Sequence, residues 1–175
     1  MCAAVIESLL VAILVFGATV VPGWPHDTRS PSFAYTRSSG CMDLLVLAYN
    51  EDATEVLAVQ VPVNPNHLPT PAAPLKLDLA KPRKGVRVWI DVYAKRQQHN
   101  WPCGDVIIED GEVPTTWLAA RGVVIVSAAD RRGLTGEYAV DVVLQNVLFR
   151  TSSGARVSSR TPIRFVANAG AGVGG

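Results

Sequence analysis

The chain has 175 residues, of which 49% are hydrophobic, and 16 Lys and Arg against 15 Asp and Glu leave a net charge of +1. A chain of this length fits one domain with short tails and can bury a core without the help of a metal. The nearly balanced charge argues against a dedicated nucleic-acid binder, which normally carries a clear basic excess.

Residues 2–22 are nearly all apolar, and Pro22 and Gly23 end the run before a polar segment begins. Such a start resembles a secretory signal peptide, with a mature chain beginning near Trp24. Two features depart from that pattern: Glu7 lies inside the run, and no Lys or Arg precedes it. The run is also close to the roughly 20 residues that span a bilayer, so a membrane anchor and a buried core helix stay open. We therefore expect an exported protein, periplasmic, extracellular or membrane-anchored, with residues 1–23 as its signal peptide or anchor.

The segment from Ile6 to Leu14 is also similar to the hydrophobic N-terminal helix of type IV pilins and pseudopilins. In that family an early Glu lies in the apolar helix and pairs with the amine of a neighbouring subunit. The resemblance implies that Glu7 takes this role and that processing falls before Ala3. The chain departs from the family in having Cys2 where a Gly is usual, and its apolar run ends far sooner.

Cys41 and Cys103 are the only cysteines in the body of the chain, because Cys2 belongs to the N-terminal run. An even pair in an exported protein predicts a disulfide. Closing a loop of about 60 residues would stabilise the fold by about 4 kcal/mol in the chain-entropy model. Two buried free thiols, or lipid attachment at Cys41, are the alternatives. A metal site is disfavoured because neither cysteine has a second ligand at the usual spacing.

Short apolar stretches separated by turns follow one another after residue 40. Residues 45–49 and 56–61 flank a polar turn, which predicts a β-hairpin. Five prolines between positions 62 and 74 mark a loop, and residues 75–79 alternate again as a brief strand. Further short strands are expected at 105–109, 117–121, 123–126, 155–159 and 163–166, with 117–121 also open to one helical turn.

Two runs show the alternation of a half-buried strand most clearly. Residues 86–93 place Val86, Val88, Ile90 and Val92 on one face, and Arg87, Trp89, Asp91 and Tyr93 on the other. Residues 138–149 form the longest run, with Tyr138, Val140, Val142 and Leu144 on one face.

No long segment after residue 24 shows helical periodicity, so the fold class is all-β, with a β-sandwich expected and a small barrel as the alternative. A Cys, then Trp89, then a second Cys resembles the immunoglobulin pattern in architecture only, since Cys103 follows too soon and Trp101 stands where that fold has a tyrosine. We expect an extended lead-in over 24–40, the sandwich over 41–167 and a flexible tail over 168–175. The body also loosely resembles uncharacterised exported bacterial β domains, which implies no function.

No catalytic, metal or cofactor motif is found, and no enzyme activity is predicted. The three histidines, His26, His67 and His99, fall in predicted loops, and no Gly-x-Ser-x-Gly elbow is present. A hydrolase therefore ranks third among the functional hypotheses. One acidic stretch offers oxygen ligands for calcium, but its spacing matches no EF-hand; its residues are Asp105, Glu109, Asp110 and Glu112.

Aromatic and cationic side chains gather around the strand at 86–93, and these suit a groove for a glycan or a polyanion. The candidate ligand-binding residues are Arg87, Trp89, Tyr93, Lys95 and Trp101. The alternative is a solvated turn beside a sheet edge or a second core face. The sequence thus favours a non-enzymatic exported binding or structural module of the cell envelope, whose partner is a glycan, a polyanion or an envelope protein. A pilin-like subunit that assembles through its N-terminal helix is the main alternative.

Overall fold

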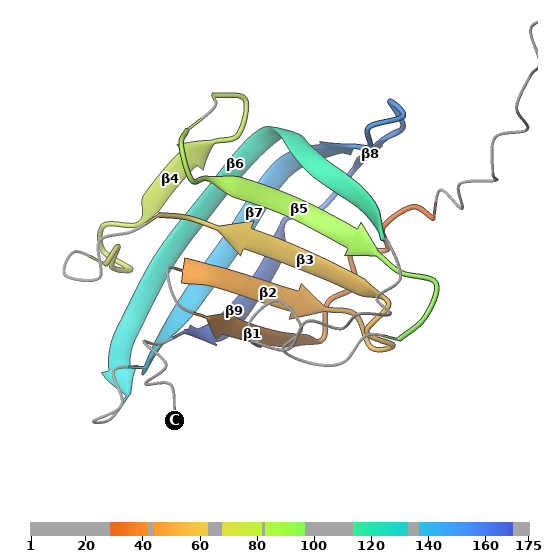
Figure 1. The fold of residues 1–175 in the computed structure, drawn as a ribbon. Coiled ribbons are helices and arrows are strands. Elements are labelled where there is room, and N and C mark those ends of the chain that lie inside the picture. The colour runs from red at the N-terminus through yellow and green to blue at the C-terminus, as the bar shows by residue number, and fades with distance from the viewer. Residues whose placement is uncertain are drawn as a thin grey trace, which may run out of the picture.

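The computed structural model describes residues 29–41, 44–62, 68–81, 83–96, 114–132 and 137–169. Within these ranges nine strands form one continuous antiparallel sheet (Figure 1), and the all-β prediction is confirmed. The strands are β1 (Arg37–Cys41), β2 (Leu45–Tyr49), β3 (Glu55–Gln60), β4 (Leu75–Asp78), β5 (Arg87–Val92), β6 (Thr115–Arg132), β7 (Glu137–Arg150), β8 (Arg156–Ser158) and β9 (Ile163–Ala169). The apolar run at 2–22 lies outside these ranges, and no helix inside them is long and apolar enough to cross a membrane.

The sheet runs in the order β1-β2-β3-β5-β6-β7-β8, with β4 added to β6 and β9 added to β7. The hairpin expected at 45–49 and 56–61 is present as the antiparallel pair of β2 and β3. The two longest strands, β6 and β7, each have two partners on their outer sides: the first part of β6 pairs with β5 and a later part with β4, while β7 pairs first with β9 and at its end with β8.

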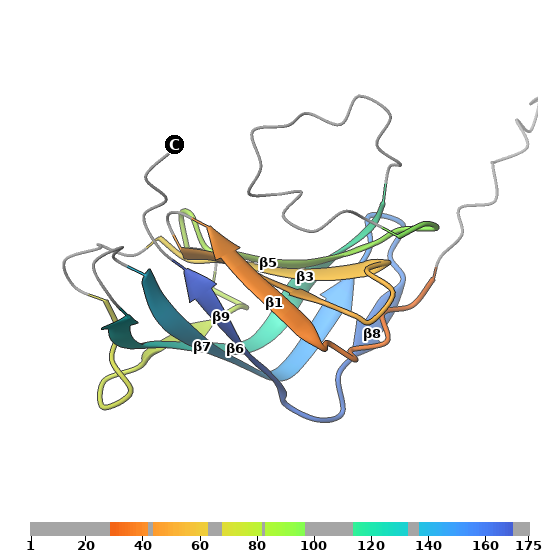
Figure 2. The same cartoon turned by 90° about the horizontal axis from the view of Figure 1, so that it is seen from below.

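The long hairpin of β6 and β7 thus joins two groups of strands. The sheet curls so that β1 and β9 meet, and it is nearly closed as a barrel (Figure 2). At the junction, the Ser38 hydroxyl donates to the Val166 carbonyl oxygen at 2.5 Å. Gly40 is needed there because a Cβ at this position would lie 2.6 Å from the Asn168 carbonyl oxygen. In place of the two packed sheets of a sandwich, the chain forms one curled sheet, which is the alternative architecture that the sequence left open.

Every second side chain along the strands points into the barrel and fills it. Both predicted inner faces are confirmed: the apolar sets of 86–92 and 138–144 belong to one core, and each fully buried Val, Leu or Ile stabilises the fold by about 1.5–3 kcal/mol. On β7 the alternation shifts by one residue at Asn146, which adopts a φ of 52°. Val147 and Phe149 then face the core, as expected for a β-bulge.

A second apolar cluster lies on the outer side of β2, β3 and β5. It consists of Leu47, Tyr49, Val56, Ala58 and Tyr93, with Leu45 and Trp89 packed at its border. Strands β2 and β3 are consequently buried on both faces, unlike the single buried face that is usual in antiparallel sheets.

The segment before β1 is fastened to the barrel by one carboxylate. Glu55 is 3% exposed, and its oxygens accept hydrogen bonds from the Ser32 backbone N–H at 2.7 Å, the Ser32 hydroxyl at 2.8 Å, the Phe33 N–H at 3.2 Å and the Tyr35 hydroxyl at 2.6 Å. Burial, and then the neighbouring Glu55 charge, raise the pKa of Tyr35 above its ordinary value. The Phe33 ring packs 5.9 Å from the ring of Phe149, measured between centroids.

The strands extend slightly beyond the expected domain limits of 41 and 167. β1 begins at Arg37, inside the expected lead-in, because residues 37–41 pair with β2 through their backbone. β9 continues to Ala169, inside the expected tail. Cys41 ends β1, and Cys103 lies outside the described residues, so the disulfide between them stays a prediction.

Candidate ligand-binding face

The outer side of β5 carries the polar and aromatic set that the alternation predicted. The Trp89 indole nitrogen donates to Asp91 Oδ2 at 2.8 Å, and the Arg87 guanidinium lies 4.6 Å from the centroid of the Trp89 ring, within the range of a cation–π contact. The half-buried ring is therefore held from two directions. Because the ring is already ordered, the Trp89 side chain loses less entropy when a ligand contacts it.

Asp91 is the carboxylate at the centre of this set. Besides the bond from Trp89, its Oδ1 accepts a hydrogen bond from the Thr116 hydroxyl at 2.6 Å. Burial raises the pKa of Asp91 above its ordinary value, and the bonds from Thr116 and Trp89 and the Arg87 charge only partly offset this effect. Both carboxylate oxygens are thus engaged in holding side chains of β5 and β6 in place.

The register of the sheet extends this set across the neighbouring strands. Trp89 lies opposite Leu118 on β6, Leu118 opposite Arg150 on β7, and Arg150 opposite Arg156 on β8. These four residues are called the outer row below. Side chains directly opposite each other on antiparallel strands have Cβ atoms about 5 Å apart, so the outer row is a continuous stripe that changes from aromatic to aliphatic to cationic.

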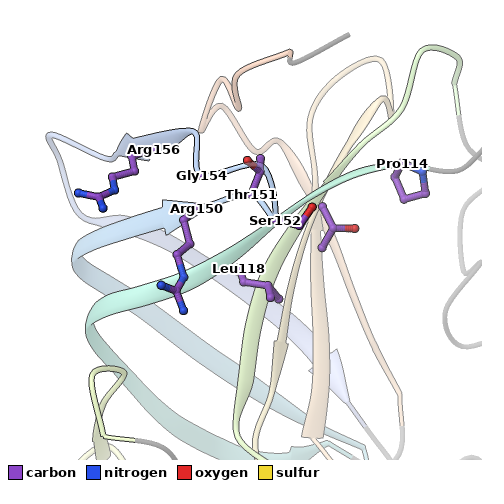
Figure 3. Close-up of a pocket in the computed structure, with 8 residues that line it drawn as sticks. Pro114, Leu118, Arg150, Thr151, Ser152, Gly154 and Arg156 are labelled. Carbon is purple, nitrogen blue, oxygen red and sulfur yellow. The ribbon is translucent and has the colours of Figure 1, made fainter. Parts of the chain in front are cut away.

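The cationic half of the outer row borders an open depression of about 580 Å³ (Figure 3). Leu118, Arg150 and Arg156 line it, together with Ser152 in the turn that joins β7 to β8. That turn is held by Thr151, whose hydroxyl accepts from the Ala155 N–H at 3.1 Å and lies 2.7 Å from the Ser153 hydroxyl. Leu118 is 42% exposed, an unusual degree for a large apolar side chain on this sheet.

Arg150 and Arg156 are not neutralised by any described acidic side chain within ion-pair distance. Arg164 on β9 provides the contrast, because it donates two hydrogen bonds to Asp141 at 3.0 and 2.8 Å. Like charges placed directly opposite each other across two strands repel. The depression therefore presents two adjacent positive charges that an anion would neutralise.

The structure brings only some of the predicted site residues together. Arg87, Trp89 and Tyr93 share the outer side of the sheet, but Tyr93 is 1% exposed and packs in the outer apolar cluster, so its ring is not presented to solvent. Lys95 is exposed beyond the end of β5. Trp101 lies outside the described residues.

Leu118, Arg150 and Arg156 were not predicted from the sequence. Each is distant from Trp89 along the chain and reaches it only through strand register. The alternation predicted along 138–149 would even place residue 150 on the inner face with Leu144, and only the bulge at Asn146 turns Arg150 outward.

The acidic stretch at 105–112 and all three histidines lie outside the described residues. Among the residues that are described, no group of three or more His, Cys, Asp or Glu side chains could hold a metal ion.

Comparisons of this chain with protein-family models, with curated proteins and with solved structures found no match in any of the three. Function is therefore inferred from the outer row and the depression beside it.

Proposed function

We propose that this chain is an exported, non-enzymatic binding module of the cell envelope that holds its ligand along the outer row. The observation that carries the proposal is the cross-strand line of Trp89, Leu118, Arg150 and Arg156 beside an open depression. An oriented indole ring and an exposed Leu offer contact area to an apolar ring face, and the arginines offer charge. The export component rests on the apolar run at residues 2–22.

The chemistry of the depression supports binding over hydrolysis. Cleavage of a glycosidic bond commonly uses two carboxyl groups on opposite sides of the bond. None of the described lining residues carries a carboxylate, and the nearby Asp91 has both oxygens occupied by Trp89 and Thr116. The side chains present there can orient and neutralise a ligand.

The test is an array of neutral glycans, acidic glycans and other polyanions, probed with the wild-type protein and with Trp89→Ala. We expect the variant to lose at least about tenfold in affinity for every ligand that the wild type binds, because truncating a central aromatic anchor commonly costs this much. Lys76→Gln changes an exposed residue of β4 outside the outer row and should bind like the wild type.

Trp89 is half-buried, so Trp89→Ala is first compared with the wild type in urea unfolding. Leu118→Glu provides a second variant, because residue 118 is exposed and the change places a negative charge in the outer row. Equal array signals from the wild type, Trp89→Ala and Leu118→Glu would refute the proposed binding face.

A further inference from the structure

We infer that Arg150 and Arg156 together bind one oxyanion group of an acidic polysaccharide that lies along the outer row. The inference rests on the proposed function and adds the chemical class of the ligand. The oxyanion is a sulfate, phosphate or carboxylate group carried by the sugar chain.

The position of the two arginines fits a single oxyanion. They lie directly opposite each other on β7 and β8, and neighbouring strands are about 4.8 Å apart. In Figure 3 the Arg150 side chain extends downward and the Arg156 side chain extends to the left and down, both beside the depression. A guanidinium group donates two parallel hydrogen bonds to such an anion, so two adjacent guanidinium groups can share one anion, which also relieves their mutual repulsion.

The length of the outer row indicates an extended ligand. From Trp89 to Arg156 the row crosses three strand spacings, which amounts to roughly 14 Å. One small anion cannot contact both ends. A sugar chain can place a ring face against Trp89 and Leu118 and a charged substituent between the arginines.

The charge distribution favours a polysaccharide over a nucleic acid. Duplex DNA is bound mainly through many phosphate contacts spread along a basic surface, whereas this chain has a net charge of +1. Arg150 and Arg156, which have no ion-pair partner among the described residues, lie at one end of the outer row, and the Trp89 ring with Arg87 against it lies at the other. Such a surface suits a polymer with sparse charges and exposed ring faces.

Four dextrans test the inference by biolayer interferometry on the full chain: dextran sulfate, dextran phosphate, carboxymethyl dextran and neutral dextran. We expect at least one acidic dextran to bind at least about tenfold more tightly than neutral dextran, since hydrogen bonds to charged groups are the strong ones. The three acidic forms show which oxyanion is preferred. Equal binding of all four would overturn the inference.

Single variants then test the two arginines. Arg150→Gln and Arg156→Gln should each weaken binding of the preferred acidic dextran by about tenfold or more, and Arg150→Lys should recover only part of the loss because it keeps the charge but not the fork. Lys76→Gln removes the same charge from β4 and should leave affinity unchanged. An equal loss in Lys76→Gln would show a general charge effect and overturn the inference.

The double variant tests whether the arginines share one group. If they do, Arg150→Gln with Arg156→Gln weakens binding by less than the product of the two single effects, because either single change already disrupts the shared site. Losses that multiply would mean two separate anions. Urea unfolding without ligand should show no loss of stability in the single variants, since each removes a repulsion.

Failure of this inference can be separated from failure of the proposed function. If Trp89→Ala and Leu118→Glu abolish binding of a glycan while both arginine variants bind it normally, the face binds a ligand but not through an oxyanion. If no ligand responds to Trp89→Ala or Leu118→Glu, the proposed function itself is wrong. Tighter binding to duplex DNA or to anionic lipid vesicles than to any acidic dextran would replace the polysaccharide with that partner.

Discussion

Glu55 is a buried carboxylate whose described partners are neutral donors from the segment before β1. In Glu55→Gln one carboxylate oxygen becomes an NH₂ group, which cannot accept from the donors it faces. We expect a loss of about 2 kcal/mol or more in the free energy of unfolding, the usual cost of leaving a buried donor unsatisfied. Urea unfolding at neutral pH measures it.

The matched control is Glu51→Gln, because Glu51 is exposed in the turn between β2 and β3. Its unfolding midpoint should match that of the wild type. Equal midpoints in Glu55→Gln and Glu51→Gln would show that the lead-in is held by its apolar contacts, such as Phe33 against Phe149, and not by the carboxylate.

Asp91 makes stability depend on pH in a defined direction. Its folded-state pKa is raised above the ordinary value of 3.8, so the folded protein binds this proton more tightly than the unfolded chain does. The stabilisation from Asp91 is therefore present at low pH and is lost as the pH rises from about 3.8 through the folded-state pKa. Asp91→Asn removes this loss, and an amide can still accept from Trp89 and donate to the Thr116 hydroxyl.

The measurement is urea unfolding at several pH values from about 3.5 to 7, in the wild type, in Asp91→Asn and in Asp52→Asn. The stability of Asp91→Asn relative to the wild type should increase over this range. Asp52 is exposed in a turn, and its variant serves as the control for removing one negative charge. A stability difference between Asp91→Asn and the wild type that does not change with pH would contradict the assignment.

At the scale of the elements, Gly122 lets β6 bend between its two neighbours. Its φ is +123°, and a Cβ there would lie 2.8 Å from both the Cα and a methyl carbon of Val147. We expect Gly122→Ala to reduce stability by about 2–4 kcal/mol, combining backbone strain with overpacking. Gly154→Ala is the control, because Gly154 also has a positive φ, of +91°, but nothing lies within 4 Å of its added Cβ.

Chemical denaturation of both variants tests the bend. Gly154→Ala should lose only about 1 kcal/mol, the cost of the left-handed backbone alone. If the two variants lose the same amount, close packing at the bend contributes nothing, and the φ requirement alone explains the glycine.

The sequence predicted those strands whose alternation is unbroken and missed those whose alternation is interrupted or absent. The hairpin of β2 and β3 and the faces of β5 were predicted because their alternation is local and unbroken. The two runs at 117–121 and 123–126 were expected as separate elements, whereas they are parts of one strand interrupted by register shifts around Arg121. Most of β1 lies within the predicted lead-in, because Ser, Gly and Arg give no apolar alternation and the pairing with β2 uses backbone groups that every residue has.

At the scale of the molecule, alternation cannot distinguish a sandwich from a barrel, because both place every second side chain inward. Whether a barrel forms depends on whether β9 returns to β1. Gly40 allows that contact because it has no Cβ. The outer row was unpredictable for the same reason. Trp89, Leu118 and Arg150 become neighbours through the register of distant strands.

Export makes a prediction for the whole chain. Protein purified from its native host without reductant should begin near Trp24 and have a mass two hydrogens lower than the reduced chain, because Cys41 and Cys103 are expected to be oxidised together. Intact mass spectrometry before and after reduction measures both properties. A start at Ala3 would favour the pilin-like alternative and its Glu7, while an intact Met1 or free thiols at both positions would contradict export with a disulfide.

The meeting of β1 and β9 has a consequence for the order of folding. β6 and β7 begin to pair at Arg132 and Glu137, close along the chain, whereas Ser38 and Val166 are 128 residues apart. Contacts between distant residues carry a larger loop-closure entropy and tend to form late. We expect Gly40→Ala to accelerate unfolding with little effect on refolding, and Gly122→Ala to slow refolding, in stopped-flow urea jumps.

If Gly40→Ala instead slows refolding, the contact between β1 and β9 forms before the rate-limiting step. The hairpin of β6 and β7 would then not be the folding nucleus. With the expected result, the lifetime of the folded protein depends on how long β1 and β9 stay together.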